Sequence, residues 1–418
     1  MSVVPRQGAR RGVVELVLGT VVGQGLVVAL SPVLSRLYTP TDFAVLQMFT
    51  GVVSVAAVLA TLRMEFAIPL AEEEREARAI SATGLWATVL GSILVGVLGW
   101  LTADLWAHGA SLQGLRDLFW MVPPTIAVLA AFQIVSHSLV RQERYRDLAV
   151  RNAAQGVGTA AGQIGLGLAG LQPLGLLLGM GAGRAFGLVA MRRRRSGPPP
   201  EGRIRFAEMT AVLGRYRRFP LLNSPSTLIN RIGQYAPYAV FGVTFGAPAM
   251  GLLTFAARLL AFPVQMVAQA VTQVYFGRGA STLRENPAEV PRLTRLATSR
   301  LALYAAGPTA LVALLAPWLF PIVFGEAWAQ AGTFLALLAI GSFAQLVAAP
   351  AGFVFVLLER QDVALAWEVV RLLMVLAAPY LAWAFGGSVL VGVAAYTLAL
   401  VLSYLGVMVL AWWVMRRG

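Results

Sequence analysis

The sequence predicts an all-α integral membrane protein of about twelve transmembrane helices. Of its 418 residues, 58% are hydrophobic and only 12% are charged. A soluble domain carries about 25% charged residues, so water is a poor solvent for this chain. Apolar runs of roughly twenty residues, enough to cross a bilayer core as helix, recur from one end to the other. Arginines gather in alternate short segments between these runs.

The apolar runs form two sets of six predicted helices. The first set is expected at 12–34, 42–62, 79–101, 117–139, 149–169 and 173–191. The second set is expected at 221–246, 249–275, 298–320, 329–357, 361–385 and 388–414. The segment 192–219 between them is basic and rich in proline, so it is predicted to be a cytoplasmic linker. We therefore expect an N-terminal six-helix bundle at 1–191 and a C-terminal six-helix bundle at 220–418.

Arginine placement predicts the orientation, because loops rich in basic residues stay in the cytoplasm. With a cytoplasmic N-terminus, the external segments hold only Arg36 and Arg116. We expect a multi-pass protein of the bacterial inner (cytoplasmic) membrane with both termini in the cytoplasm. The arginines of these cytoplasmic segments account for the net charge of +14, so nucleic acid binding is not expected. There is no cysteine and there are two histidines, and we expect neither a metal site nor a cofactor.

The two halves echo each other faintly in sequence. TPTDFAVLQMF after the first helix aligns with GAPAMGLLTFA after the seventh. Six helices per half place the second half in the same orientation as the first. The pattern therefore favours two bundles related by a pseudo-two-fold axis along the membrane normal, with a cleft between them.

Charged residues inside predicted helices are candidates for function, because burial of a charge in the bilayer is costly. Arg231 and Arg258 lie near the midplane of adjacent predicted helices. Two cations at one depth repel each other unless they share an anion. We therefore favour a basic cavity that binds phosphate or pyrophosphate. The alternative is that each arginine pairs with carbonyl groups or with a buried acid elsewhere.

Other polar groups in the helices allow either a structural or a functional interpretation. Glu368 and Arg371 have the spacing of an intrahelical ion pair, which favours a structural role. Arg184 lies among small residues, so a tight helix crossing and a ligand site are equally compatible with it. His137 shares a helix face with Gln133 and could bond to another helix or relay protons. Three further side chains could bind sugars or hold helices together: Gln24, Asn223 and Asn230.

Two stretches of the chain resemble a known family. SRLYTPTDFAVLQMF followed by LATLRMEFAIPLAEEEREA resembles the first two helices of Wzx-type polysaccharide and O-antigen flippases, of the multidrug/oligosaccharidyl-lipid/polysaccharide exporter superfamily. The block from NSPSTLINRIGQYAPYAVFGV to QAVTQVYF is similar to a later part of the same family. The resemblance implies a V-shaped exporter of two six-helix bundles that works by alternating access. The family motif residues that carry over are Arg36, Arg63, Glu65 and Arg258.

The substrate that the resemblance implies is an oligosaccharide on undecaprenyl pyrophosphate, flipped from the cytoplasmic to the periplasmic leaflet. Such a protein would serve O-antigen, capsule or exopolysaccharide biosynthesis beside polymerases and glycosyltransferases, and would have no catalytic residues of its own. Arg63 and Glu65 could meet the pyrophosphate or fix the end of their helix. We expect a monomer, and a Na⁺ or H⁺ coupling ion is left open.

Two other functions remain as alternatives. A cation-coupled drug antiporter would share the fold, although it would be expected to place carboxylates in its cavity. A membrane polysaccharide polymerase is less favoured, because the longest predicted external loop, Thr102–Arg116, is short for that class.

Overall fold

The computed structural model describes residues 7–102, 116–194 and 202–417. Most of the predicted external loop Thr102–Arg116 and the proline-rich part of the predicted linker therefore lie outside the described residues. Within the described ranges the secondary structure is helical and no strand occurs. The chain divides into two compact units, Met1–Tyr235 and Ala236–Gly418. The division falls inside one helix, so each unit is described by itself.

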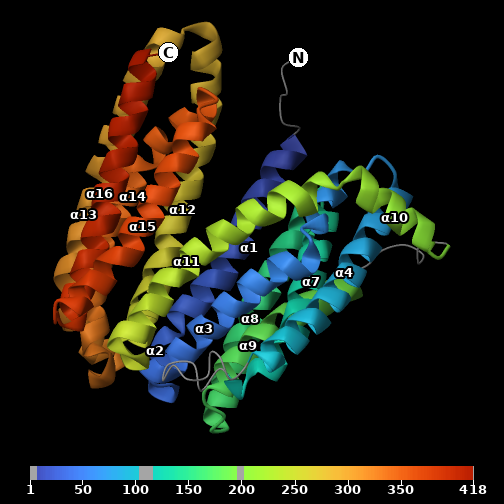
Figure 1. The fold of residues 1–418 in the computed structure, drawn as a ribbon, viewed down its shortest axis with the longest axis horizontal. Coiled ribbons are helices and arrows are strands. Elements are labelled where there is room, and N and C mark those ends of the chain that lie inside the picture. Colours follow the sequence, from blue (N-terminus) through green and yellow to red (C-terminus); the bar gives the residue numbers. More distant parts are fainter. Residues whose placement is uncertain (1–6, 103–115, 195–201, 418) are drawn as a thin grey trace. The chain divides into compact units, whose positions relative to one another are not determined.

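The first unit packs its long helices in neighbouring pairs (Figure 1). Helix α8 contacts both α1 and α9, while α4 contacts α3 and α7. Helix α3 begins with a capping box, in which the Thr39 side chain accepts from the backbone of Asp42 and the Asp42 carboxylate accepts from Thr39. The elements in order are α1 (Gln7–Ala29), α2 (Ser31–Leu37), α3 (Pro40–Thr61), η1 (Met64–Leu70), α4 (Glu74–Leu101), η2 (Phe119–Met121), α7 (Val122–Arg141), α8 (Tyr145–Leu168), α9 (Leu174–Arg193), α10 (Phe206–Arg215) and η3 (Phe219–Asn223).

The second unit is built around α14 (Ala329–Leu357), which contacts α12 (Ala247–Glu285), α13 (Val290–Phe324) and α16 (Val389–Arg417). Short turns η4 (Pro287–Glu289) and η5 (Glu326–Trp328) precede α13 and α14, and α15 (Gln361–Ala384) packs on α16. At one end of the unit, the ring of Phe255 meets those of Phe320, Phe324 and Trp328 at centroid distances of 4.3–6.3 Å. Helices α12 and α13 are 39 and 35 residues long, well beyond the roughly 20 that a bilayer needs.

The predicted transmembrane helices are confirmed in the described residues. Ten helices are long and apolar enough to cross a bilayer. Helix α8 and helix α11 (Ser224–Phe245) are long enough at 24 and 22 residues, but their polar side chains lower their hydropathy. These two coincide with the predicted helices 149–169 and 221–246. The protein is therefore an all-α, multi-pass membrane protein of about twelve spans.

Helix α10 is an element that the sequence did not predict, inside the segment expected to be a linker. Its Glu208 carboxylate accepts from Arg75 Nε at 2.5 Å, and Arg215 pairs with Glu72 at 2.7 Å and with Glu76 at 2.9 Å. On its apolar side, Val212 joins the buried cluster formed by η1 and the start of α4. Helix α10 is thereby fixed to this end of the unit, and η3, which follows it, lies against η1.

Candidate functional site

A sharp corner at the end of α3 places Arg63. Leu62 and Arg63 both adopt left-handed backbone angles, with φ of 50° and 56°. This conformation is uncommon for residues other than glycine and costs about 1–3 kcal/mol for each residue. The corner turns the chain into η1, which sets Arg63 and Glu65 just beyond the end of the α3 span. Such strain persists where the surroundings hold it in place, and Arg63 is held by several contacts.

Arg63 is the centre of a compact polar cluster. Its Nε donates to Asn223 Oδ1 at 3.2 Å, and its Nη1 lies 3.6 Å from Glu65 Oε1. Its guanidinium carbon lies 4.0 Å from the ring centroid of Phe66, within range of a cation–π interaction. The Phe66 ring in turn lies 4.5 Å from that of His137 on α7. The cluster therefore joins the ends of α3, α7 and η3, which are far apart in sequence.

The charges in this cluster do not balance. Burial lowers the pKa of the Arg63 guanidinium, the Glu65 carboxylate opposes that shift, and the cation of Arg231 adds to it. Burial also raises the pKa of the Glu65 carboxyl, whose side chain is only 4% exposed. Among the described residues Arg231 has no carboxylate partner, and its Nη1 donates to Gln234 Oε1 at 3.1 Å. Arg63 is thus paired with the one buried carboxylate of the cluster, and Arg231 adds a second positive charge close enough to repel Arg63.

The first half of α11 continues this cluster as a polar face. Asn223 Oδ1, which accepts from Arg63, also accepts from Thr227 Oγ1 at 3.4 Å. One turn further, Gln234 Nε2 donates to Asn230 Oδ1 at 3.1 Å. Positions three and four residues apart lie on one side of a helix, so these groups and Arg231 form a continuous row. We call Arg63, Glu65 and this row the Arg63–α11 site.

The row ends at Tyr235, which packs against α3. Its hydroxyl accepts from Ser54 Oγ at 3.1 Å, and a side chain at Gly51 would meet its ring at 3.2 Å. Glycine at this position therefore lets the tyrosine ring approach the backbone of α3. Arg184 of α9 interacts electrostatically with the same tyrosine and donates to Met180 O at 3.4 Å. The structure thus places predicted residue Arg184 beside the end of the row.

Two predicted residues of the first unit lie outside this cluster. Arg36 is exposed in the last turn of α2, at the opposite end of α3 from Arg63. The 22 residues of α3 separate the two arginines by about 33 Å. Gln24 is exposed on α1. The structure does not bring Arg36 into one site with Arg63, and a substrate role for Gln24 stays a prediction.

The second unit holds the remaining predicted residues. Arg258 is half-buried on α12, two residues after the buried run 249–256 ends. Glu368 and Arg371 form the predicted intrahelical ion pair on α15, with Arg371 Nε 2.9 Å from Glu368 Oε2. Arg231 and Arg258 belong to different units, so the prediction that they share one anion stays a prediction.

Two features of the first unit are not predicted by the sequence. Arg151 was counted with the cytoplasmic arginines, yet it is 5% exposed, bonds to Asn152 Oδ1 at 2.7 Å and covers the Phe132 ring at 4.0 Å. In the predicted helix 149–169 it is only the third residue, whereas the structure begins α8 at Tyr145 and so places it deeper in the helix. The contribution of Tyr235 has no signal in the sequence, because nothing there indicates that a tyrosine in the middle of a predicted helix bonds to Ser54, 181 positions earlier.

Comparisons with known proteins place the chain in a family. A profile of the family described as "Polysaccharide biosynthesis protein" matches residues 33–332. The teichuronic acid biosynthesis protein TuaB of Bacillus subtilis (strain 168) is 29% identical over 143 residues, which is 34% of this chain and 29% of that protein. The match thus spans under a third of the length of that relative.

Solved structures of low sequence identity share the fold. The lipid II flippase MurJ in an inward closed conformation gives a TM-score of 0.72 at 9% identity, over 95% of this chain and 86% of that one. An inward-facing multidrug resistance MATE family transporter of the MOP superfamily gives 0.64 at 14% identity, over 97% and 98%. These findings confirm the resemblance seen in the sequence. The chain belongs to the polysaccharide biosynthesis protein family, and it has the fold of these MOP-type transporters.

Proposed function

We propose that this membrane protein flips a lipid-linked oligosaccharide, carried on undecaprenyl pyrophosphate, from the cytoplasmic to the periplasmic leaflet. The observation that carries the proposal is the cation excess of the Arg63–α11 site, where Arg63 pairs with Glu65 and Arg231 adds a second cation that has no carboxylate partner among the described residues. Family membership supports polysaccharide synthesis as the pathway, whether O-antigen, capsule or exopolysaccharide. Glycosyltransferases would supply the substrate and a polymerase would use the product.

A pyrophosphate group suits the electrostatics of this site. Like charges on Arg63 and Arg231 disfavour each other, and an anion between them turns that repulsion into attraction. Guanidinium groups bind phosphate oxygens in a planar, two-pronged geometry that an ammonium group lacks. The uncharged row of Asn230, Gln234 and Tyr235 offers donors and acceptors for sugar hydroxyls. The polyprenyl tail would stay in the bilayer.

The transport cycle that we propose is alternating access. Arg258 of the second unit would bind the same anionic group during part of the cycle. The division between the units falls between Tyr235 and Ala236, and Pro237 follows at once inside α11. Proline removes one backbone hydrogen bond and weakens a helix at that point. Helix α11 could therefore bend where the polar row ends.

The proposed orientation places both termini in the cytoplasm of a bacterium, with the chain in the inner membrane. Its support is the distribution of arginine in the sequence. The Arg63 corner would then face the leaflet in which lipid-linked sugars are assembled. A cation-coupled drug antiporter has the same fold, but the carboxylate of this site is already paired with Arg63. We therefore favour an anionic cargo.

Substitution of the arginines tests the proposal. Arg231→Gln and Arg258→Gln each remove a charge, and Arg217→Gln removes an exposed arginine near η3 as the matched control. The readout is surface polysaccharide in cells that depend on this chain, normalised to the amount of protein in the membrane. We expect at least about tenfold less polymer for Arg231→Gln, because a hydrogen bond to a charged group contributes about 1.5–3 kcal/mol. Normal polymer at normal protein levels would overturn the proposal.

A further inference from the structure

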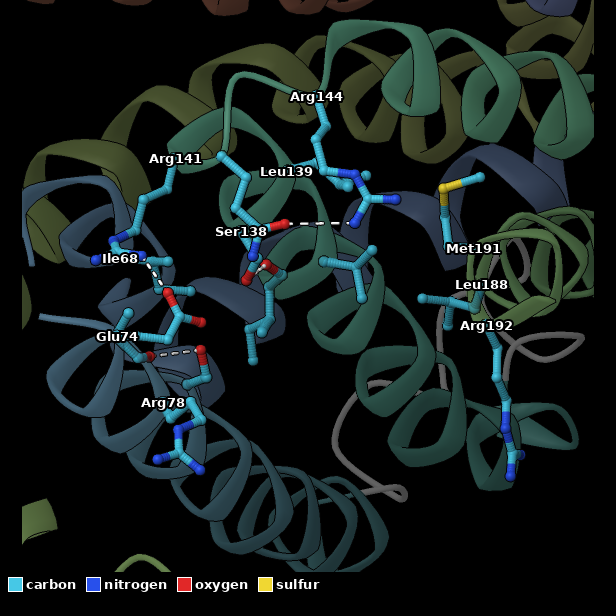
Figure 2. Close-up of a pocket in the computed structure, with 15 residues that line it drawn as sticks. Ile68, Glu74, Arg78, Ser138, Leu139, Arg141, Arg144, Leu188, Met191 and Arg192 are labelled. Carbon is cyan, nitrogen blue, oxygen red and sulfur yellow. Dashed lines mark hydrogen bonds and ion pairs between the residues drawn. The ribbon is translucent and has the colours of Figure 1, made fainter. Parts of the chain in front are cut away.

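A second polar feature lies in the first unit, away from the polar row of α11. It is a pocket of about 620 Å³ between α4, α7 and α9, at the end of the unit where these helices carry arginines. Four arginines line it, and we call it the arginine pocket (Figure 2). Its lining residues are Ile68, Glu74, Ala77, Arg78, Ser81, Ile134, Val135, Ser138, Leu139, Arg141, Gln142, Arg144, Leu188, Met191 and Arg192.

The rim of the arginine pocket is positively charged from several directions. Arg78 comes from α4, Arg141 from the last turn of α7, and Arg192 from the last turn of α9. Arg144 comes from the turn that follows α7. Glu74 is the one carboxylate in the lining, and it pairs with Arg141, as Figure 2 shows. Four arginines against one glutamate leave the lining with a formal charge of +3.

The neighbouring carboxylates do not cancel this charge. Asp147 lies beside the pocket and pairs with Arg144 at 2.7 Å, but it also pairs with Arg194 at 3.0 Å. Arg192 is exposed and has no carboxylate partner among the described residues. A ligand with negative charge would therefore be attracted to the Arg192 side of the pocket.

The wall of the same pocket is apolar. Ile134, Val135 and Leu139 of α7 and Leu188 and Met191 of α9 form much of its lining. This composition is unfavourable for a small hydrated anion, which gains nothing from apolar surface. It suits a molecule with a charged group and a hydrocarbon part.

The apolar surface continues out of the pocket along α4. Leu85 lies one turn beyond Ser81 on the same face of the helix and is 42% exposed. Val89, a further turn along, is 47% exposed. Both lie in a span that is long and apolar enough to cross a bilayer, so this exposed face would contact lipid chains. The arginine rim thus lies at the end of a hydrocarbon-facing strip.

We propose that the arginine pocket binds the phosphodiester headgroup of an anionic phospholipid, with one acyl chain along the exposed face of α4. Arginine and phosphate form charge-assisted, bidentate hydrogen bonds, and basic pockets between transmembrane helices suit such headgroups. Ile68 of η1 lines the pocket, and η1 also carries Glu65 of the Arg63–α11 site. A bound lipid would therefore stabilise the element that holds that site in place.

Native mass spectrometry of the detergent-purified full chain tests this proposal. The probes are phosphatidylglycerol, phosphatidylcholine and inorganic phosphate. We expect phosphatidylglycerol to bind most strongly and inorganic phosphate not to compete at equal concentration. The variant Arg192→Gln should weaken phosphatidylglycerol binding about fivefold. This is the change in affinity that corresponds to the roughly 1 kcal/mol contributed by one arginine near an anionic lipid surface.

Arg193→Gln is the matched control, because Arg193 is the neighbouring exposed arginine of α9 and does not line the pocket. Equal weakening by both variants, or equal binding of the two phospholipids, would overturn the proposal. Effective competition by inorganic phosphate would assign the pocket to a soluble anion and overturn it as well.

Hydrogen exchange at η1 gives a second measurement that does not depend on the variants. Phosphatidylglycerol should slow exchange of the η1 amides in the wild-type chain, whereas phosphatidylcholine should not. Unchanged exchange with bound phosphatidylglycerol would overturn the link between the pocket and η1.

Discussion

The buried ion pair between Arg63 and Glu65 gives the sharpest prediction about the site. Replacement of Arg63 by glutamine leaves Glu65, only 4% exposed, without its cation. Loss of one partner of a buried pair costs about 3–5 kcal/mol. The pair is separated by 3.6 Å and Arg63 is 15% exposed, so we expect the lower end, about 3 kcal/mol at pH 8. Removal of Arg63 also relieves its repulsion with Arg231, which lowers the cost of the substitution.

The stability cost of Arg63→Gln should be larger at high pH than at low pH. Burial raises the pKa of the Glu65 carboxyl above its unfolded value, and removal of Arg63 raises it further. The folded Arg63→Gln chain therefore retains a proton that the unfolded chain releases. Stability is greatest below the unfolded pKa of about 4.3 and falls as the pH rises toward the folded pKa. We expect Arg63→Gln to be closer to wild type at pH 5 than at pH 8.

The double variant Arg63→Gln with Glu65→Gln removes both charges. Since neutral replacement of a buried pair costs little, its stability should return to within about 1 kcal/mol of wild type. The free energy of unfolding can be measured in mixed micelles by the fluorescence of the ten tryptophans. A loss below about 1 kcal/mol for Arg63→Gln at pH 8, or a double variant as unstable as the single one, would refute this reasoning.

Polysaccharide export by the same double variant separates a structural from a functional role. If Arg63 contacts the pyrophosphate, the double variant should be stable yet deficient in export. Normal export by a stable double variant would assign Arg63 to the helix corner alone.

Three further predictions concern the elements around the site. Asn223→Ala should lower export several-fold with a stability loss of about 1–2 kcal/mol, measured by the same two assays, because Arg63 loses a hydrogen bond. Pro237→Ala should slow transport in reconstituted vesicles while it raises helix stability, because it restores a backbone donor inside α11. The hydrogen bond from Arg75 lowers the pKa of Glu208 to about 2, so the attachment of α10 should persist from pH 8 to pH 5. Protection of the α10 amides, taken relative to the intrinsic exchange rate at each pH, should be the same at pH 5 and pH 8 and should be lost on Glu208→Gln.

The helices could be predicted because the bilayer imposes one simple requirement. A run of about twenty apolar residues is a strong signal, and α3 at Pro40–Thr61 lies within two residues of the predicted 42–62. For several other helices, α4, α8, α12 and α13 among them, the predicted range is too short at one end or at both. Helix α13 begins at Val290, ahead of the predicted 298, because its first turns carry arginines outside the apolar run.

The site could be predicted only in part. Arg63 and Asn223 were both candidates, but nothing in the sequence indicated that residues 160 positions apart form a hydrogen bond. The left-handed corner at Leu62 and Arg63 was not predictable, because tertiary contacts and not glycine stabilise it. Helix α10 was missed because ten residues in a basic segment give a weak signal, and its ion pairs to α4 come from distant sequence.

Whether the cargo is a lipid-linked pyrophosphate held by Arg231 can be tested by mass spectrometry of the lipid that co-purifies with the wild-type chain and with Arg231→Gln. We expect an undecaprenyl-pyrophosphate oligosaccharide on the wild-type chain and much less of it on Arg231→Gln at equal protein. Arg217→Gln should retain the wild-type amount. Lipid-linked sugar that is absent from the wild-type chain in cells that assemble it, or present equally on Arg231→Gln, would contradict the claim.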